Sequence, residues 1–330
     1  MGRREWIALG LTILLLVILL SQTHLQTIAE AFTRLSPVTV CAGFAVWAFT
    51  NVLRSRRFRA LILSRDVPRL RMFCIVNVQN MLAAVTPARA GDLSVVWLLR
   101  QGSRVPGPEG LAGLVMARVL DFVIVSGVGV VALIGVTGGL HGRTGPFLAV
   151  AAVIFLAALM LAYRLERITA LGARLVRYLI GRTRLRERSL GQRIMEKAGE
   201  VHTHVLRTRS RVSTLRLWGI TAAIWISTYA LSWLWLKGLG LPFSLGEVIF
   251  VAAIGGLVAS LPIQGLLGFG TTEAGWAIPL MILGRSREEA IAIGFCLHGL
   301  AIVYLLILGG TSALYLSLEA RAEVPSRAGE

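Results

Sequence analysis

Residues Leu111–Val136 read LAGLVMARVLDFVIVSGVGVVALIGV, an apolar stretch interrupted by one arginine and one aspartate. A membrane-spanning α-helix needs roughly 20 predominantly apolar residues, and this stretch is longer than that. It does not show the strict alternation of apolar and polar residues that is typical of a barrel strand. Because hydrocarbon offers the backbone no hydrogen-bond partners, the stretch predicts a helix that crosses a membrane.

Other apolar stretches of spanning or nearly spanning length occur along the chain. They are Trp6–Leu20, Val38–Val52, Pro146–Tyr163, Leu217–Leu236, Leu245–Ile263 and Ile291–Leu318. The composition agrees, since 55% of the residues are hydrophobic and 15% are charged, whereas about a quarter of a soluble domain is charged. We therefore predict an all-α polytopic membrane protein with about six full spanning helices and two broken, re-entrant hairpins. A single transmembrane domain is expected over residues 1–319, with a short cytoplasmic tail at 320–330.

The net charge is +17, and the basic residues are concentrated in two segments that are expected to be loops between helices, 54–72 and 164–216. The loops around His24 and His141 carry few charges. This asymmetry follows the positive-inside rule, so both basic segments are expected in the cytoplasm of a cell bounded by this membrane. Segment 164–216 is expected to form one or two amphipathic helices that contact anionic lipid headgroups. Nucleic-acid binding is not predicted.

The N-terminus resembles a signal peptide, because Arg3 and Arg4 precede an apolar run. No small-residue cleavage site follows that run before His24, so a retained first helix with a cytoplasmic N-terminus is preferred.

Two apolar regions are interrupted by proline and glycine and predict hairpins that enter the membrane without crossing it. The first contains Pro87 and Gly91, and the second contains Pro262, Gly268 and Gly270. Such broken backbone is tolerated at membrane depth only inside protein or beside a polar cavity. One hairpin is expected to open from the cytoplasmic side and the other from the outside, as in the inverted repeats of transporters. The alternative is two unrelated kinks in a helical bundle.

Charged side chains at membrane depth indicate a functional site, because they are costly unless they meet a partner or a cavity. The candidates for substrate binding are Arg89, Asp92, Arg118, Asp121 and Glu273, with Asn80 lining the same cavity. Arginine suits phosphate, since its planar guanidinium stays charged and donates in pairs. A structural alternative is that Arg118 and Asp121, three residues apart on one helix, neutralise each other.

The sequence contains no catalytic motif that we can identify. It has no P-loop and no Cys/His cluster, so neither ATP hydrolysis nor a metal site or other cofactor is predicted.

In three places the sequence resembles the lysylphosphatidylglycerol synthase transmembrane (flippase-like) family. The family pattern Asn…Pro-x-Arg-x-Gly-Glu is similar to Asn80 through Pro87-Ala88-Arg89-Ala90-Gly91-Asp92, and Glu-Arg-x-x-Asp is similar to Ala117-Arg118-Val119-Leu120-Asp121. Pro…Gly-x-Gly-x-x-Glu is similar to Pro262 with Gly268-Phe269-Gly270-Thr271-Thr272-Glu273. The resemblance extends over roughly residues 5–318. Asp92, Ala117 and His298 depart from the usual Glu, Glu and Arg, and these departures bear on the substrate more than on the fold.

The resemblance implies a translocase for an anionic phospholipid, an aminoacyl-lipid, or a polyprenyl lipid or glycolipid. It also implies a stand-alone membrane unit without the aminoacyltransferase domain, which would not itself synthesise lysyl-phosphatidylglycerol. Two alternatives stay open: a non-transporting scaffold for a lipid-biosynthetic enzyme partner, and a membrane-embedded transferase. The oligomeric state is not predicted.

Overall fold

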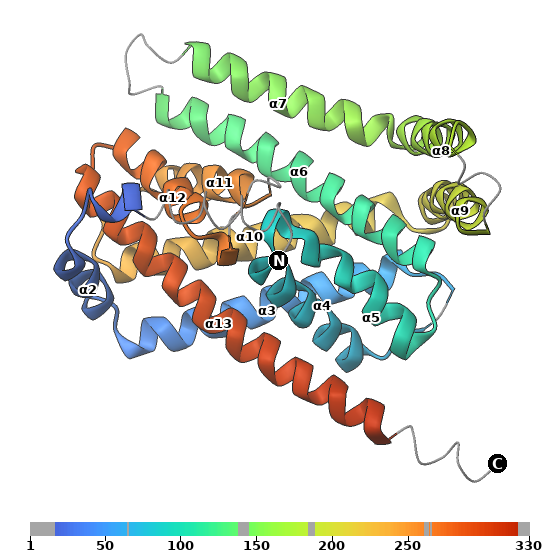
Figure 1. The fold of residues 1–330 in the computed structure, drawn as a ribbon. Helices are drawn as coiled ribbons and strands as arrows, with labels where there is room; N and C mark the ends of the chain where they lie inside the picture. Colours follow the sequence, from blue (N-terminus) through green and yellow to red (C-terminus); the bar gives the residue numbers. More distant parts are fainter. Residues whose placement is uncertain are drawn as a thin grey trace.

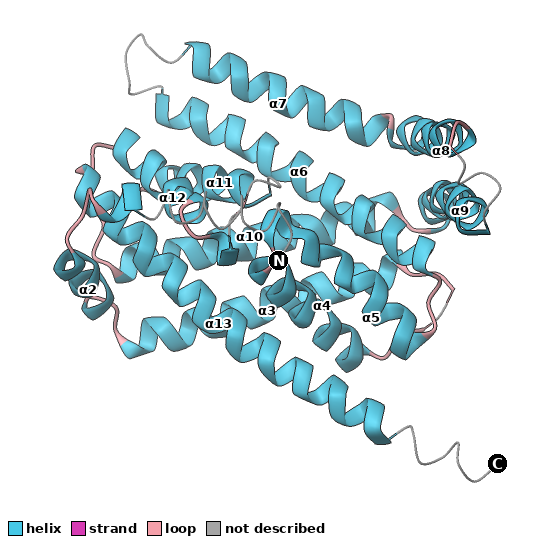
Figure 2. Ribbon diagram, in the orientation of Figure 1, coloured by secondary structure: helices cyan, strands magenta, loops and turns pink. Residues whose placement is uncertain are grey.

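The computed structural model describes residues 17–64, 66–137, 145–183, 189–260, 264 and 266–322. Within these ranges the chain consists of α-helices and short 3-10 turns, without strands (Figure 2). The predicted all-α fold is confirmed.

Four of the described helices are long and apolar enough to cross a membrane. They are α3 (Pro37–Leu61), α6 (Gly107–Thr137), α10 (Thr214–Gly238) and α13 (Arg287–Ala322). Helix α7 (Gly145–Tyr163) bends by 74° into α8 (Leu165–Gly181), and this pair would be a fifth span if counted together. The first predicted span lies mostly outside the described residues. A multi-pass membrane protein is confirmed, while the count of about six spans is not.

The first predicted hairpin consists of α4 (Arg69–Val85), the 3-10 turn η1 (Pro87–Leu93) and α5 (Ser94–Ser103). In the turn, the backbone N–H of Gly91 donates to the Thr86 hydroxyl at 2.6 Å. A Cβ on Gly91 would overlap the backbone carbonyl of Leu82, so only glycine lets the turn pack against α4.

The second hairpin consists of α11 (Leu245–Ser260), the turn η3 (Leu266–Gly268) and α12 (Thr271–Ile282). Gly268 and Gly270 have φ angles of 76° and 84°, a left-handed conformation that favours glycine. The predicted hinge residue Pro262 lies outside the described residues. Both turns also hold a non-glycine residue with positive φ, Arg89 at 56° and Leu267 at 55°. Such strain is typical of functional sites.

The helices pack as two corresponding halves. Helix α3 packs against α10, α4 packs against α13, and α11 packs against α6. The halves can be matched helix by helix, α3–α6 with α10–α13 in order. The α3–α10 contact then joins two equivalent helices, and the α4–α13 contact is equivalent to the α11–α6 contact. Figure 1 shows α3 and α10 running in opposite directions, with α4–α5 and α11–α12 toward opposite ends of the molecule. This arrangement supports the predicted inverted repeat.

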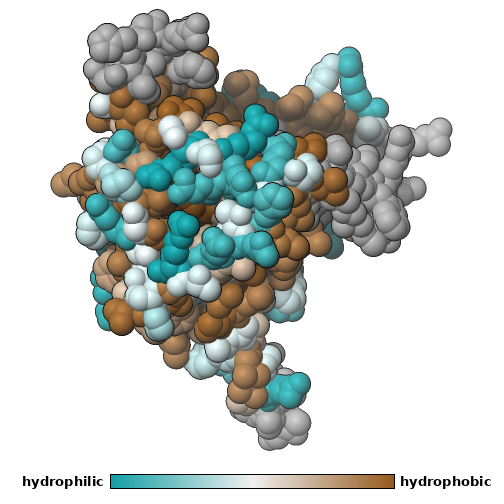
Figure 3. Space-filling model, turned by 90° about the vertical axis from the view of Figure 1, so that its left-hand side faces the viewer, coloured by the Kyte–Doolittle hydropathy of each residue, from teal (hydrophilic) through white to brown (hydrophobic). Residues whose placement is uncertain are grey.

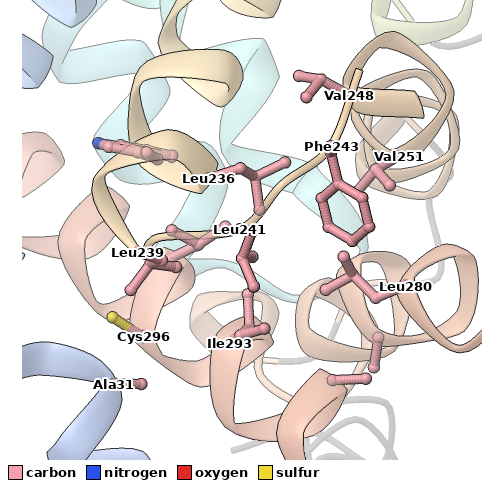
Figure 4. Packing of buried hydrophobic residues seen from close by; sticks show 14 of the residues in the cluster. Ala31, Leu236, Leu239, Leu241, Phe243, Val248, Val251, Leu280, Ile293 and Cys296 are labelled. Carbon is pink, nitrogen blue, oxygen red and sulfur yellow. The ribbon is translucent and has the colours of Figure 1, made fainter. Parts of the chain in front are cut away.

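Each hairpin has its own apolar core. The core at the α11–α12 hairpin includes Leu236, Phe243, Val248, Leu280 and Ile293, which converge from four helices and the loop before α11 (Figure 4). The core at the α4–α5 hairpin brings together residues of α3–α6, with contributions from α8, α9 (Ser189–Arg211) and α10. Because both hairpin bases are packed in this way, the two turns are held facing the middle of the molecule.

The two ends of the bundle differ. Helices α8 and α9 pack together at one end, and α2 (Leu25–Thr33) lies at the other (Figure 1). Seen from the α2 end, hydrophilic residues cluster centrally and hydrophobic residues surround them (Figure 3). The prediction of amphipathic helices in segment 164–216 is confirmed, since α8 exposes Ile168, Leu171 and Leu175 and carries three arginines.

The prediction of a basic loop at 54–72 is wrong in its bounds. Helix α3 continues to Leu61 and α4 begins at Arg69, so only the residues between them form the connection. The arginines expected in this loop include Arg54 and Arg57, which lie within α3 and line an internal cavity. The side chain of an arginine near a helix end can point toward the loop or toward the interior of the bundle. The side chain of Arg57 points toward the interior, where it forms an ion pair with Asp121 on α6.

Candidate functional site

A cavity of about 300 Å³ lies between the two hairpins. Its walls come from α3, α4, α6 and α10–α13, together with both hairpin turns. Its apolar lining includes four tryptophans, Trp47, Trp225, Trp235 and Trp276. Its charged lining includes four arginines, Arg54, Arg57, Arg89 and Arg118. A volume of this size is at the lower end of the range for small-ligand sites.

Asp92, at the end of the first hairpin turn, connects two of these arginines. One carboxylate oxygen accepts from Arg118 at 2.6 Å and the other from Arg89 at 3.2 Å. The Gln79 amide on α4 donates to the same carboxylate at 3.2 Å. Asp92 therefore fixes both guanidinium groups beside the cavity. Arg118 keeps 38% of its side chain exposed, so it still has N–H groups free to bind an anion.

Arg89 also joins the two hairpins. Its guanidinium donates to the backbone carbonyl of Ala259 at 2.9 Å, in the last turn of α11. The amide of Gln264 donates to the same carbonyl at 2.7 Å. The turn of the first hairpin thus contacts the end of α11 in the second hairpin, as the inverted-repeat hypothesis expects. Because Ala259 and Arg89 both line the cavity, this contact forms part of its wall.

Arg57 and Asp121 form a second ion pair. Two guanidinium nitrogens of Arg57 donate to the two carboxylate oxygens at 2.6 and 2.8 Å. The Trp225 indole donates to the same carboxylate at 3.2 Å. The structural alternative, a local pair of Arg118 with Asp121, is not what the structure shows, because Arg118 bonds to Asp92 and Asp121 bonds to Arg57. The i, i+3 spacing allowed a local pair, but the partners from α3 and η1 have better geometry.

Arg54 lies one helical turn before Arg57 and lines the same cavity. Its guanidinium donates to the Asn51 amide oxygen at 3.4 Å, a long hydrogen bond. The Asn80 amide donates to the same oxygen at 3.2 Å. Among the described residues, no carboxylate pairs with Arg54. Sequence reasoning missed both Arg54 and Arg57. The signal available was Asp121 itself, which needed a cationic partner at membrane depth.

Glu273 is fully buried and does not line the cavity. One of its carboxylate oxygens accepts from the Gly270 backbone N–H at 2.7 Å and so caps α12. The other lies 2.8 Å from Nδ1 of His298, whose Nε2 lies 3.1 Å from the Leu267 carbonyl. Because that carbonyl only accepts, Nε2 must donate. A proton must then lie between Nδ1 and Glu273, so the pair has no net charge.

The structure places the predicted residues in three groups. Asn80, Arg89, Arg118 and Asp121 line the cavity, and Asp92 supports two of them. Glu273 reaches the cavity only through His298, which does line it. Gly91, Gly268 and Gly270 lie at the hairpin turns as predicted, and Pro87 begins η1. The three guanidinium groups other than that of Arg57, those of Arg54, Arg89 and Arg118, lie beside an apolar wall and can hold a phosphate that carries a hydrocarbon chain.

The chain is similar to part of a curated protein, glycosyltransferase AglD of Haloferax volcanii, with 26% identity over 144 residues. The similarity covers 42% of this chain and 23% of that relative, so the chain matches less than a quarter of the relative's length. No solved structure matches the chain significantly. Residues 6–309 match the family described as the lysylphosphatidylglycerol synthase TM region. Because this match covers most of the chain, the protein belongs to the lysylphosphatidylglycerol synthase transmembrane family.

Proposed function

We propose that the protein is a flippase-like lipid translocase, which moves an anionic lipid between the two leaflets of a membrane. The observation that carries the proposal is the arginine-lined cavity between two hairpins that lie toward opposite ends of the molecule. An arginine cluster inside a membrane protein is costly unless a partner or ligand compensates its charge. A lipid phosphate supplies that compensation, and the apolar part of the lining accommodates the start of the chains.

In this proposal Arg118 and Arg89 bind the phosphate and Asp92 orients them. Asp121 holds Arg57 in place. Asn80 lines the cavity, and its side-chain amide is held by a hydrogen bond to Asn51. The two hairpins act as gates, one for each leaflet, around a fixed site. Opening requires the hydrogen bond from Arg89 to Ala259 to break. A phosphate that takes over the Arg89 guanidinium would favour this step, so binding and opening would be coupled.

The family and the relative support a cargo drawn from membrane lipids, such as a phospholipid, an aminoacyl-lipid, or a polyprenyl lipid or glycolipid. The name of the relative, a glycosyltransferase, supports a sugar-bearing lipid as one of these candidates. We place the α8–α9 end in the cytoplasm of the cell, because its helices carry the basic segment 164–216.

A scaffold for a lipid-modifying enzyme is the second candidate. The observation in its favour is the α8–α9 pair, which forms one end of the molecule and exposes apolar and basic side chains. Removing these helices would abolish function under the scaffold hypothesis but leave lipid transfer intact. A membrane-embedded transferase is a weaker third candidate, because Glu273 is buried behind His298.

Lipid transfer in liposomes tests the proposal. The purified protein is reconstituted with a fluorescent anionic lipid, and an impermeant quencher reports how much lipid reaches the outer leaflet. Arg118→Gln and Arg89→Gln are expected to slow transfer at least tenfold, because each removes a guanidinium from the cavity. Arg56→Gln is the matched control, since Arg56 is exposed on α3. Transfer at the wild-type rate by both cavity variants would contradict the phosphate role.

A further inference from the structure

The charges around the cavity do not balance. Arg57 is fully matched by Asp121, since both carboxylate oxygens accept from its guanidinium. Asp92, by contrast, is shared between Arg89 and Arg118, so one carboxylate serves two cations. Arg54 has an amide oxygen as its hydrogen-bond partner and no carboxylate among the described residues. Four arginines against two aspartates leave two positive charges.

No other described group at the cavity offsets this surplus. The remaining titratable residue of the lining is His298, and it forms a neutral pair with Glu273. Arginine cannot lose its proton in a protein, so the four cations persist at every physiological pH. Arg54 lies near Asp121, which attracts it, and near Arg57, Arg89 and Arg118, which repel it, so Asp121 is shared between two arginines as Asp92 is. The cavity therefore holds two surplus positive charges that an anionic ligand would compensate.

From this imbalance we infer that the cargo carries a doubly charged terminal phosphate, that is, a lipid phosphomonoester. A phosphomonoester bears about 1.5 to 2 negative charges at neutral pH, because its second pKa is about 6. A phosphodiester such as phosphatidylglycerol bears one charge and leaves one arginine uncompensated. An aminoacylated phospholipid adds a cation and fits the surplus still less well. This inference rests on the proposed function and narrows its substrate class.

The walls of the cavity indicate that the phosphate belongs to a lipid rather than to a free ion. Trp47, Trp225 and Trp276 line the cavity beside the arginines, and their rings would lie against the first carbons of an attached chain. Inorganic phosphate would satisfy the charges but leave this surface uncovered. Binding should therefore require both a terminal phosphate and a hydrocarbon chain.

The test compares two lipids with identical acyl chains, phosphatidic acid (a phosphomonoester) and phosphatidylglycerol (a phosphodiester). Their affinity for the full chain in nanodiscs of neutral lipid is measured at pH 7.5 and pH 5.5. Phosphatidic acid is expected to bind at least tenfold more tightly at pH 7.5. This preference should shrink at pH 5.5, because the phosphomonoester loses its second charge while the arginines keep theirs. Inorganic phosphate is expected to compete weakly.

Arg54→Gln should reduce the preference for phosphatidic acid from at least tenfold to about twofold, because one of the two surplus positive charges is removed. A tenfold preference in affinity corresponds to about 1.4 kcal/mol. Arg56→Gln, exposed on the same helix, is expected to keep the wild-type preference. The wild-type comparison and its pH dependence do not rely on the variant, so a poorly folded Arg54→Gln protein would leave the test valid.

Equal binding and equal transfer of the two lipids would overturn this inference and leave the translocase proposal standing. Binding of inorganic phosphate as tight as that of phosphatidic acid would overturn the lipid part of the inference. Tight, selective binding of phosphatidic acid without any transfer between leaflets would support the inference and contradict the proposed function.

Discussion

Arg57 and Asp121 form an ion pair whose side chains are only 4% and 13% exposed. Buried pairs of this kind add little net stability, because desolvation offsets their attraction. Losing one partner is much more costly, since the other charge is left buried and alone. The pair therefore fixes the shape of the cavity wall and leaves Arg54, Arg89 and Arg118 as the lining arginines that can face a ligand.

Asp121→Ala is expected to lower the free energy of unfolding by about 3–5 kcal/mol, because Arg57 loses its counter-charge. The double variant Arg57→Met with Asp121→Leu should recover most of this loss, since no charge stays buried. Unfolding in detergent, followed by circular dichroism, measures both. Glu166→Ala is the control, because its pair with Arg209 is well exposed and should contribute less than about 1 kcal/mol. An Asp121→Ala protein as stable as the double variant would contradict this account.

The functional residues differ in how far the sequence could predict them. Arg89 and Arg118 could be found, because a charge in an apolar stretch indicates a site wherever its partner lies. The partner of Asp121 could not, since the spacing to Arg118 suggested a local pair and Arg57 is 64 residues away. Glu273 was predicted to bind substrate, but the sequence does not show which side of α12 faces the cavity.

At the level of secondary structure, the hairpin turns depend on close backbone contacts. Gly91 sits against the carbonyl of Leu82, and its N–H bonds to the Thr86 hydroxyl. Proline and glycine have local conformational effects, so both hairpins could be predicted from the sequence. The end of α3 could not, because its arginines resemble a cytoplasmic loop and the partners that hold Arg57 lie far along the chain, on α6 and α10.

Gly91→Ala is expected to destabilise the first hairpin, because the added Cβ overlaps the Leu82 carbonyl. Displacing η1 would also separate Asp92 from Arg118, so lipid transfer should fall at least tenfold. The measurements are the thermal unfolding midpoint in detergent and transfer in liposomes. Gly172→Ala in α8 is the control, since a Cβ added there would have nothing within 4 Å and alanine favours the helix. Equal behaviour of the two variants would show that the close contact at Gly91 is unimportant.

At the level of the whole molecule, two hairpins with separate apolar cores face each other across one charged cavity. The order of helices and breaks along the chain was enough to predict this repeat. The convergence of four arginines was not, because it depends on how α3, α6 and the first hairpin pack together. The architecture predicts that a lipid headgroup passes through the cavity and not along the outer surface of the bundle.

Filling the cavity with a neutral side chain tests this route most directly. Ala84 lines the cavity from α4, whereas Ala157 is exposed on α7. Ala84→Trp should reduce lipid transfer in liposomes to less than about a tenth of the wild-type rate, because a Trp side chain buries about 150–250 Å² and would fill much of the headgroup space. Ala157→Trp should transfer lipid at the wild-type rate. A folded Ala84→Trp protein that also transfers lipid at the wild-type rate would contradict the proposed route.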